Sequence, residues 1–257
     1  MPFPRRLPRT FRRAPLALAA TLGIGALLAA CGGGAPPAPP QSQGLVLTKA
    51  TPQHIALTNQ FGRTVSLADL KGKAVVLAPF LTLCQDECPL VLAAFDALRR
   101  DVDAAGLGHK VVFVEVTVDP GRDTVARLAA YQKEYGADWD LWTGPAASLG
   151  AFWKDFGVSY LKVQEAKPAH LDWMTGQPLT YDVDHTDGYI LINAAGKERF
   201  VDANAPNLHG HLSQKLTALL NAGGVAGLHH PQGQEWTLND ALASISWLLG
   251  TNISPAS

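Results

Sequence analysis

Two cysteines, Cys84 and Cys88, are the residues whose type and spacing most clearly point to chemistry. They follow an apolar run typical of a buried strand, and they precede Pro89, a residue suited to the first turn of a helix. If both lie at the opening turn of that helix, their spacing of four places them on one side, about 6 Å apart along the axis. At that separation the two sulfurs either form a disulfide or hold one metal ion between them.

The start of a helix also favours the charged form of a thiol. Free backbone N–H groups and the positive end of the helix dipole stabilise a thiolate there and lower its pKa. Metal binding and disulfide exchange both need the thiolate form. The alternative is an inert structural disulfide of the kind common in oxidising compartments. Between Cys84 and Cys88 it would close a short loop, which contributes roughly 2 kcal/mol by the chain-entropy estimate.

Buried strands must carry these cysteines into place. Residues 73–80 and 110–118 are short apolar runs, the second rich in β-branched residues, and each predicts a strand. Residues 188–193 and 197–201 predict a hairpin that turns at Ala195-Gly196. The cysteines lie just after the first of these strands, so the strand is expected to present them at its end.

Helices are predicted where apolar residues recur at spacings of three and four. One predicted helix begins at Cys88, and two others cover residues 124–135 and 149–156. A last core helix is predicted through Leu208, Leu212, Leu216 and Leu219. Strands that alternate with helices, followed by a hairpin and a helix, indicate an α/β fold. We therefore expect a central mixed β-sheet flanked by helices.

The N-terminus has the order of features of an export signal. Residues 1–30 contain five arginines and no acidic residue, and their apolar run ends in Leu28-Ala29-Ala30-Cys31. This order predicts a bacterial lipoprotein signal over residues 1–31, whose final cysteine is lipidated. An uncleaved anchor is the alternative, although its apolar run of about 17 residues is short of the ~20 that a membrane span needs. Both interpretations predict a chain attached to the cell membrane and facing its periplasmic or other extracytoplasmic side.

A Gly- and Pro-rich tether is predicted at residues 32–44, with a reach of at most ~40 Å at ~3.1 Å per residue. The first 30 residues hold five of the chain's 21 basic residues and none of its 22 acidic ones. The remainder therefore has 16 basic against 22 acidic residues, a balance that argues against nucleic-acid binding. A hydrophobic content of 47% with 17% charged residues excludes a mainly disordered chain.

Three blocks of sequence occur in a recognisable order after the tether: FLTLCQDECP at 80–89, VDPGRDT at 118–124, and DHT at 184–186, with YILI at 189–192. With the lipoprotein start, they resemble the Sco/SenC family of thioredoxin-like, membrane-tethered copper proteins. The resemblance covers about residues 46–221 and implies a thioredoxin-like domain over 45–221. It also implies that Cys84, Cys88 and His185 bind copper.

This ligand set agrees with the chemistry of copper. Two thiolates and one imidazole are soft, low-coordinate ligands that suit Cu(I) and also accept Cu(II). A structural zinc site usually has four protein ligands, whereas this set has three. The resemblance therefore implies a copper chaperone, a carrier without turnover. Its implied acceptor is the dinuclear copper centre of a membrane cytochrome c oxidase during oxidase assembly.

A second function fits the same residues. Cys84 and Cys88 would be the redox-active pair of a thiol–disulfide oxidoreductase that reduces cysteines of the acceptor or acts in redox defence. In that case the protein would be an enzyme. Thioredoxin-like folds usually carry redox cysteines two residues apart, so the wider gap and the implied His185 favour metal binding.

The chain departs from the family pattern at three places. Gln85 stands where members often have proline, and residues 164–182 form a longer stretch that contains Trp173 and Met174. That stretch is interpreted either as a solvent loop or as a cover for the metal site. Residues 222–257 lie beyond the family pattern, and Thr237-x-x-Asp240 there predicts a capping box. The extra C-terminal helix that follows, with Leu238, Leu242, Ile245 and Leu249 on one stripe, is expected to pack against the domain rather than bind a partner.

The lipobox generates a first testable prediction. We expect the membrane-extracted protein to lack residues 1–30 and to carry a diacylglyceryl group on Cys31, because the signal is cleaved just before that cysteine. Mass spectrometry of the intact protein and of its N-terminal peptide measures both features. A Cys31→Ser variant, which removes the acceptor thiol, provides the control. An intact N-terminus would contradict the prediction and support the uncleaved anchor.

Overall fold

A mixed β-sheet lies at the centre of the fold. The computed structural model describes residues 37–40, 44–230 and 234–256, and within them eight strands form one sheet in the order β1-β10-β9-β4-β5-β6-β2-β3. Its strands are β1 Leu45–Ala50, β2 Leu57–Asn59, β3 Thr64–Val65, β4 Ala74–Phe80, β5 Val111–Thr117, β6 Asp140–Thr143, β9 Tyr189–Ile192 and β10 Lys197–Asp202. β4, β5 and β6 run parallel, and the remaining neighbours pair antiparallel. The predicted mixed sheet is therefore present.

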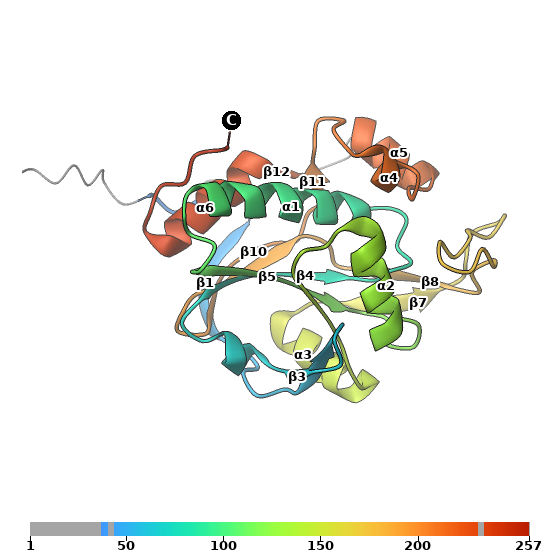
Figure 1. Ribbon diagram of the computed structural model, residues 1–257, viewed down its shortest axis with the longest axis horizontal. Coiled ribbons are helices and arrows are strands. Elements are labelled where there is room, and N and C mark those ends of the chain that lie inside the picture. Colours follow the sequence, from blue (N-terminus) through green and yellow to red (C-terminus); the bar gives the residue numbers. More distant parts are fainter. Residues whose placement is uncertain (1–36, 41–43, 231–233, 257) are drawn as a thin grey trace, which may run out of the picture. The chain divides into compact units, whose positions relative to one another are not determined.

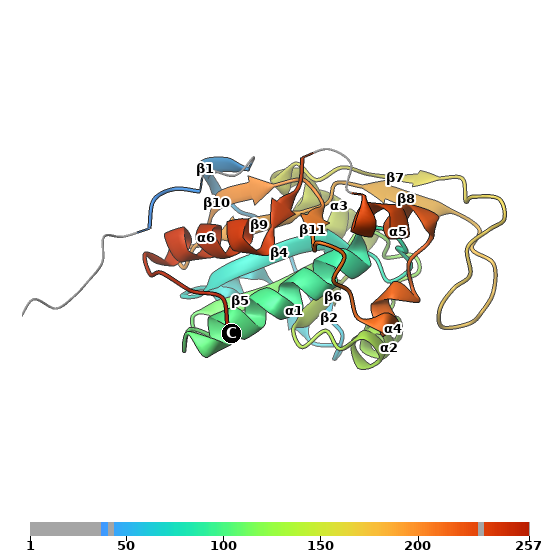
Figure 2. The same cartoon turned by 90° about the horizontal axis from the view of Figure 1, so that it is seen from above.

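Helices cover both faces of this sheet. They are α1 Cys88–Ala104, α2 Val125–Tyr135, α3 Ala146–Phe156, α4 Gln214–Thr217, α5 Ala222–His229 and α6 Leu238–Leu249, with a 3₁₀ helix at Leu67–Leu70. α1 and α6 lie together on one face, and α3 lies on the opposite face (Figure 1). Figure 2 shows the first of these faces from above, with α1 and α6 crossing in front of the strands. Because both faces are covered, every residue of β4 is buried, and the strand reads as a continuous apolar run.

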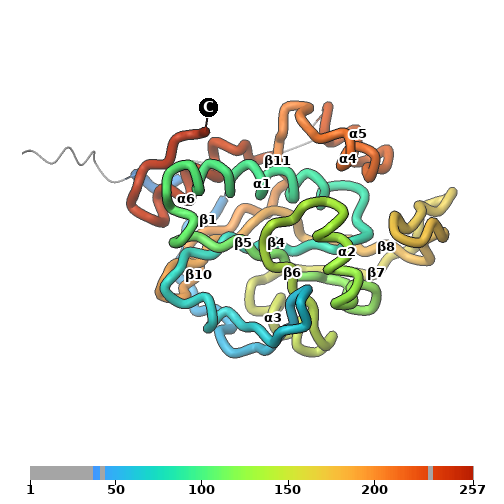
Figure 3. Tube along the Cα trace, viewed as in Figure 1, coloured from blue at the N-terminus to red at the C-terminus, as the bar shows by residue number. Residues whose placement is uncertain are grey.

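Two smaller sheets flank the central one. β7 Tyr160–Val163 pairs antiparallel with β8 Asp182–His185, and β11 Pro206–Asn207 pairs parallel with β12 Trp236–Thr237. The chain between β7 and β8 is the long stretch noted in the sequence. It extends at the end of the molecule where α4 and α5 also lie (Figure 3).

The predicted last core helix is wrong over most of its length. Of the residues from Leu208 to Leu219, only Gln214–Thr217 are helical. His209 and Gly210 adopt positive φ angles of 51° and 78°, which lie in the left-handed region and interrupt a right-handed helix. Ser213 then caps α4 by accepting a hydrogen bond from the Leu216 N–H. The regular leucine spacing therefore identified three buried residues, Leu208, Leu216 and Leu219, but did not predict their backbone conformation.

The C-terminal extension is part of the domain's packing. The predicted capping box forms, because Thr237 Oγ1 accepts from the Asp240 N–H at 3.2 Å and Asp240 Oδ2 accepts from the Thr237 N–H at 2.9 Å. The Trp236 ring meets the Tyr189 ring of the central sheet at 4.9 Å between centroids. α6 contacts α1, and Leu242 and Ile245 of its apolar stripe are buried. The expectation that this helix packs against the domain is therefore confirmed.

The predicted lipoprotein signal, including Cys31, and residues 32–36 and 41–43 of the tether lie outside the described residues. Within the part of the chain that is described, no helix combines the length and the apolar character needed to cross a membrane.

The packing of α6 generates a prediction about stability. Ile245 is completely buried, so Ile245→Ala should lower the free energy of unfolding by about 2–5 kcal/mol through lost burial and the cavity left behind. Chemical denaturation monitored by circular dichroism measures this change. Val225→Ala is the matched control, because Val225 is also aliphatic, lies in the same extension and is 40% exposed. Equal stability of the two variants would contradict the assignment of α6 to the core.

Candidate metal centre

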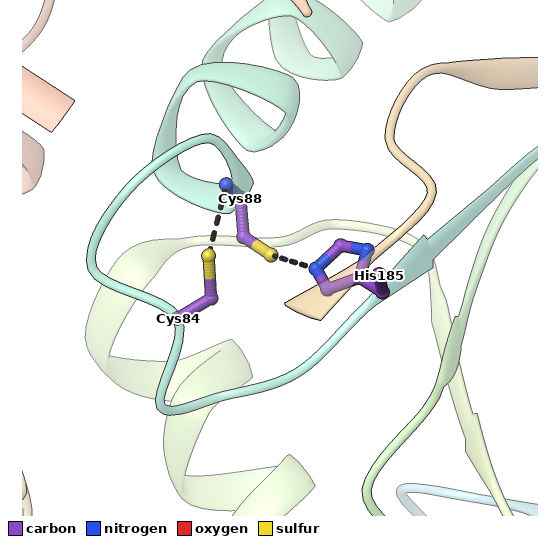
Figure 4. A group of neighbouring side chains, drawn as sticks. All are labelled: Cys84, Cys88 and His185. Atoms are coloured by element: carbon purple, nitrogen blue, oxygen red, sulfur yellow. Dashed lines mark hydrogen bonds between the residues drawn. The ribbon is translucent and has the colours of Figure 1, made fainter. Parts of the chain in front are cut away.

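Three elements bring Cys84, Cys88 and His185 together. Cys84 lies in the loop that follows β4, Cys88 is the first residue of α1, and His185 is the last residue of β8. One ligand atom from each side chain lies within 4.8 Å of the others. The Cys88 Sγ is 3.5 Å from His185 Nε2, and the backbone N–H of Cys88 donates to the Cys84 Sγ at 3.4 Å (Figure 4). Among the described residues, no other group of this kind exists.

The chain delivers His185 through a turn that requires glycine. Gly188, between β8 and β9, has a φ of +88°, and a Cβ there would lie 1.8 Å from the Asp202 carbonyl oxygen. Glycine at this position therefore lets the backbone pass close to the end of β10 before it enters β9 of the central sheet. His185 Nδ1 lies 2.9 Å from the Thr186 carbonyl oxygen, which can only accept a hydrogen bond. Nδ1 therefore carries a hydrogen, and Nε2 is the ring nitrogen that faces the sulfurs.

The two thiols have opposite acidity. The hydrogen bond from the Cys88 side chain holds the pKa of the Cys84 thiol well below its usual value, and His185 adds to this lowering against the effect of burial. Burial, and next the neighbouring Cys84, raise the pKa of the Cys88 thiol well above its usual value. In metal-free protein Cys84 is therefore the first of the two thiols to ionise as the pH rises.

The charge of the Cys84 thiolate also changes the pKa of His185 and of the nearby carboxyl groups. Burial works to lower the pKa of His185, but the Cys84 thiolate, Asp187 and the Thr186 carbonyl outweigh it and raise this pKa to about 9. Burial, followed by Asp187, Asp86 and Cys84, raises the pKa of Glu87 to about 8. Burial likewise raises the pKa of Asp86 and of Asp187, each to about 6. Repulsion among Cys84, Asp86 and Asp187 also contributes to these raised pKa values, and a bound cation would relieve it.

The ligands are enclosed but lie beside an opening. The exposed fractions are 9% for Cys84, 2% for Cys88 and 5% for the His185 side chain. A surface hollow of about 450 Å³ adjoins His185 and is lined by Ser159, Tyr160, Leu161, Asp184 and Thr186. His185 is therefore the one ligand of the three that borders this hollow.

A buried carboxylate that sequence analysis did not single out holds the cysteine loop, defined here as residues 81–87. Asp123 accepts hydrogen bonds from the Thr82 N–H at 3.2 Å and from the Thr82 and Thr117 hydroxyls. It lies in the VDPGRDT block, so the block itself was a signal for it. Trp173, which the sequence shows only as part of the long stretch, donates from its indole N–H to the Thr82 carbonyl at 2.7 Å. The stretch at 164–182 therefore contacts the cysteine loop, which contradicts the solvent-loop interpretation.

A family model described as SCO1/SenC matches residues 47–220. The chain belongs to the SCO1/SenC family. It is 31% identical over 120 residues to the mitochondrial protein SCO1 homolog 1 of Arabidopsis thaliana, which covers 45% of this chain and 34% of that protein. It is 29% identical over 141 residues to the SCO1 protein homolog of Bacillus subtilis, covering 54% of this chain and 71% of the relative. A protein of Stutzerimonas stutzeri named as a candidate copper-binding protein is 27% identical over 151 residues, covering 59% and 68%.

Solved structures of Sco proteins share the architecture. The solution structure of apo Sco1 from Thermus thermophilus matches with a TM-score of 0.50 and 24% identity, over 74% of this chain and 96% of that one. Arabidopsis thaliana ScoI with copper bound matches with a TM-score of 0.49 and 25% identity, over 67% and 93%. BsSco, described as a member of the Sco family of cytochrome c oxidase assembly proteins, matches with a TM-score of 0.45 and 21% identity, over 63% and 89%. The predicted thioredoxin-like α/β fold is confirmed.

The difference between the two thiols generates a prediction about pH. In reduced, metal-free protein we expect Cys84 to ionise well below the usual thiol range, because Cys88 and His185 both stabilise its thiolate. Ultraviolet absorbance of the thiolate during a pH titration measures this in the full chain carrying Cys31→Ser. Cys88→Ala should move the Cys84 titration upward, since it removes the largest stabilising contact. His211→Ala, which changes an exposed histidine, is the control, and a single titration in the usual thiol range would contradict the prediction.

Proposed function

We propose that the protein is a membrane-tethered copper carrier that delivers copper to an extracytoplasmic acceptor. The observation that carries this proposal is the convergence of two sulfurs and one imidazole nitrogen within 4.8 Å. The acceptor that we propose is the dinuclear copper centre of cytochrome c oxidase. BsSco, the relative described as an oxidase assembly protein, supports this choice at the level of the family name.

The donor set fits copper better than zinc. Thiolate and imidazole are soft ligands that suit Cu(I), which accepts low coordination numbers. A structural zinc site needs a fourth ligand, and the described residues place no further His, Cys, Asp or Glu atom in the group. The copper-binding name of the Stutzerimonas relative supports the same metal. Cu(I) held by Cys84, Cys88 and His185 would therefore be cargo with room for one more ligand.

That open position suits transfer. An acceptor ligand could join the copper before one of the carrier's ligands leaves, so that the ion is never released into water. His185 is the neutral ligand of the set and lies beside the hollow, so it is the side from which an acceptor can enter. A tether of the length predicted for residues 32–44 would keep the domain near a membrane-bound acceptor.

The second candidate is a thiol–disulfide oxidoreductase. It is favoured by one observation, the lowered pKa of Cys84 next to a free Cys88, because a thiolate starts disulfide exchange. The reaction needs two sulfurs and does not need an imidazole ligand. His185 therefore separates the two functions.

Copper binding to variants tests the carrier. Cys84→Ala and Cys88→Ala should each abolish tight Cu(I) binding, since two remaining ligands cannot enclose the ion. His185→Ala should lower the affinity at least tenfold, about 1.4 kcal/mol. Competition with a chromophoric Cu(I) chelator measures these affinities, and His211→Ala is the matched histidine control. Full-affinity binding by either cysteine variant would overturn the proposed site.

The same His185→Ala variant decides between the functions in cells. As a carrier variant it should fail to support a copper-loaded oxidase at low copper, while its Cys84–Cys88 pair still exchanges with a small dithiol. If such cells assemble the loaded oxidase normally, the oxidoreductase takes the carrier's place.

A further inference from the structure

The middle of the cysteine loop is held from two sides by segments that contribute no metal ligand. On one side, the Asn221 N–H donates to the Gln85 carbonyl at 2.7 Å. On the other, the Gln85 side chain donates from Nε2 to the Leu171 carbonyl at 2.7 Å, and Trp173 donates to Thr82. Gln85 directly follows Cys84, so both the main chain and the side chain of this residue are restrained between the two cysteines.

The first segment approaches so closely that glycine is required. A Cβ on Gly224 of α5 would lie 2.8 Å from the Gln85 carbonyl oxygen and 3.1 Å from the Asp86 Cα. A Cβ on Gly223 would lie 2.7 Å from an Asp86 carboxylate oxygen. Gly227, in the same helix, has open space at the equivalent point. The start of α5 is therefore in direct backbone contact with the cysteine loop, and α5 lies beyond the residues that match the family model.

The second segment is fixed to the body of the domain. Arg127 of α2 forms two hydrogen bonds with the Asp172 carboxylate, at 3.0 and 2.6 Å. The Trp173 ring packs edge-on against the Tyr131 and Tyr135 rings of α2, with centroids 5.9 and 5.3 Å apart. Such a bidentate ion pair and aromatic cluster hold the segment firmly, so its contacts with Thr82 and Gln85 act as a fixed support.

A disulfide needs the cysteine loop to adjust. The two sulfurs must approach to about 2.05 Å with a defined dihedral angle. In this structure both cysteines are free, the Cys84 Sγ accepts from the Cys88 N–H, and the Cys88 Sγ faces His185. Only three residues separate the cysteines, so a restraint on Gln85 and Asp86 limits the change in backbone that would bring the sulfurs together.

We propose that Trp173 and the Asn221–Gly224 turn are positioning elements that hold the Cys84–Cys88 pair in its open dithiol geometry and disfavour the disulfide. This inference deepens the proposed function, because an open dithiol is the form that receives copper. Its chemistry can be measured without metal. Oxidised glutathione takes two electrons from the pair, so that two Cys thiols and one glutathione disulfide give one Cys84–Cys88 disulfide and two reduced glutathione molecules.

Redox equilibrium in glutathione buffers tests the proposal on the full chain carrying Cys31→Ser, in detergent and with a metal chelator. Gly224→Ala should displace α5 from Gln85, and Trp173→Phe should remove the indole donor while keeping an aromatic ring. Each should shift the equilibrium constant towards the disulfide at least tenfold, about 30 mV for a two-electron couple. Quenching with an alkylating reagent followed by mass spectrometry measures the oxidised fraction.

Matched controls separate positioning from general destabilisation. Gly227→Ala adds a methyl group to the open face of α5, and Trp236→Phe removes an indole donor that binds the Asn204 carbonyl instead. Both should keep the wild-type equilibrium constant. If Gly224→Ala does not fold, as judged by circular dichroism, Trp173→Phe still decides the question. Wild-type redox equilibria in the folded test variants, or equal shifts in the controls, would overturn the proposal.

Two separate measurements distinguish failure of the copper-carrier function from failure of the positioning role. A wild-type protein that binds no Cu(I) would refute the carrier, but the metal-free glutathione equilibria of the variants would still report on the loop. Conversely, tight copper binding with unchanged equilibria would leave the carrier in place and refute the positioning role.

Discussion

The contact between the Cys88 Sγ and His185 Nε2 depends on one feature of the sheet, the antiparallel pairing of β4 with β9. Its register sets Leu77 opposite Ile190, so the start of β9 lies beside the end of β4. The loop before β9 must then lie next to the loop after β4, and residues 97 positions apart in the chain meet there. Gly188 permits the close turn that completes this arrangement. A shift in register would move His185 away from both sulfurs.

Because the site is buried, the contacts around Cys84 determine whether its thiol can carry a negative charge. A thiolate in a nearly closed site has little water to stabilise it, so it depends on Cys88, the imidazole and the start of α1. Neighbouring Glu87 responds with a pKa of about 8 and is largely protonated at neutral pH. A monovalent cation bound to the sulfurs compensates the same negative charge directly. The metal and the protons therefore compete for the same ligand atoms, and copper binding releases the protons that these ligands still carry.

Local sequence patterns predicted the elements whose residues face the core, because burial imposes a period on them. The runs at β4 and β5 and the stripe of α1 are of this kind, whereas the Thr237–Asp240 capping box was predictable as a local hydrogen-bond motif. The leucines from Leu208 to Leu219 show the limit, since apolar spacing does not detect the left-handed backbone at His209 and Gly210. Contacts such as Gly224 with Gln85 or Trp173 with Thr82 join segments far apart in sequence. No local period encodes them, and the residues that match the family model end at 220, before α5.

The enclosure of the site bears on the choice between carrier and reductase. A thiol that attacks a protein disulfide must present its thiolate to a bulky partner, so both acidity and access determine the rate. Cys84 has the acidity, but it is only 9% exposed and its partner Cys88 is 2% exposed. A copper ion needs much less access than a protein disulfide, and it gains from every buried ligand at once. The same lowered pKa that would activate a nucleophile in an open cleft therefore serves, in this enclosed geometry, to keep a ligand deprotonated for a small cation.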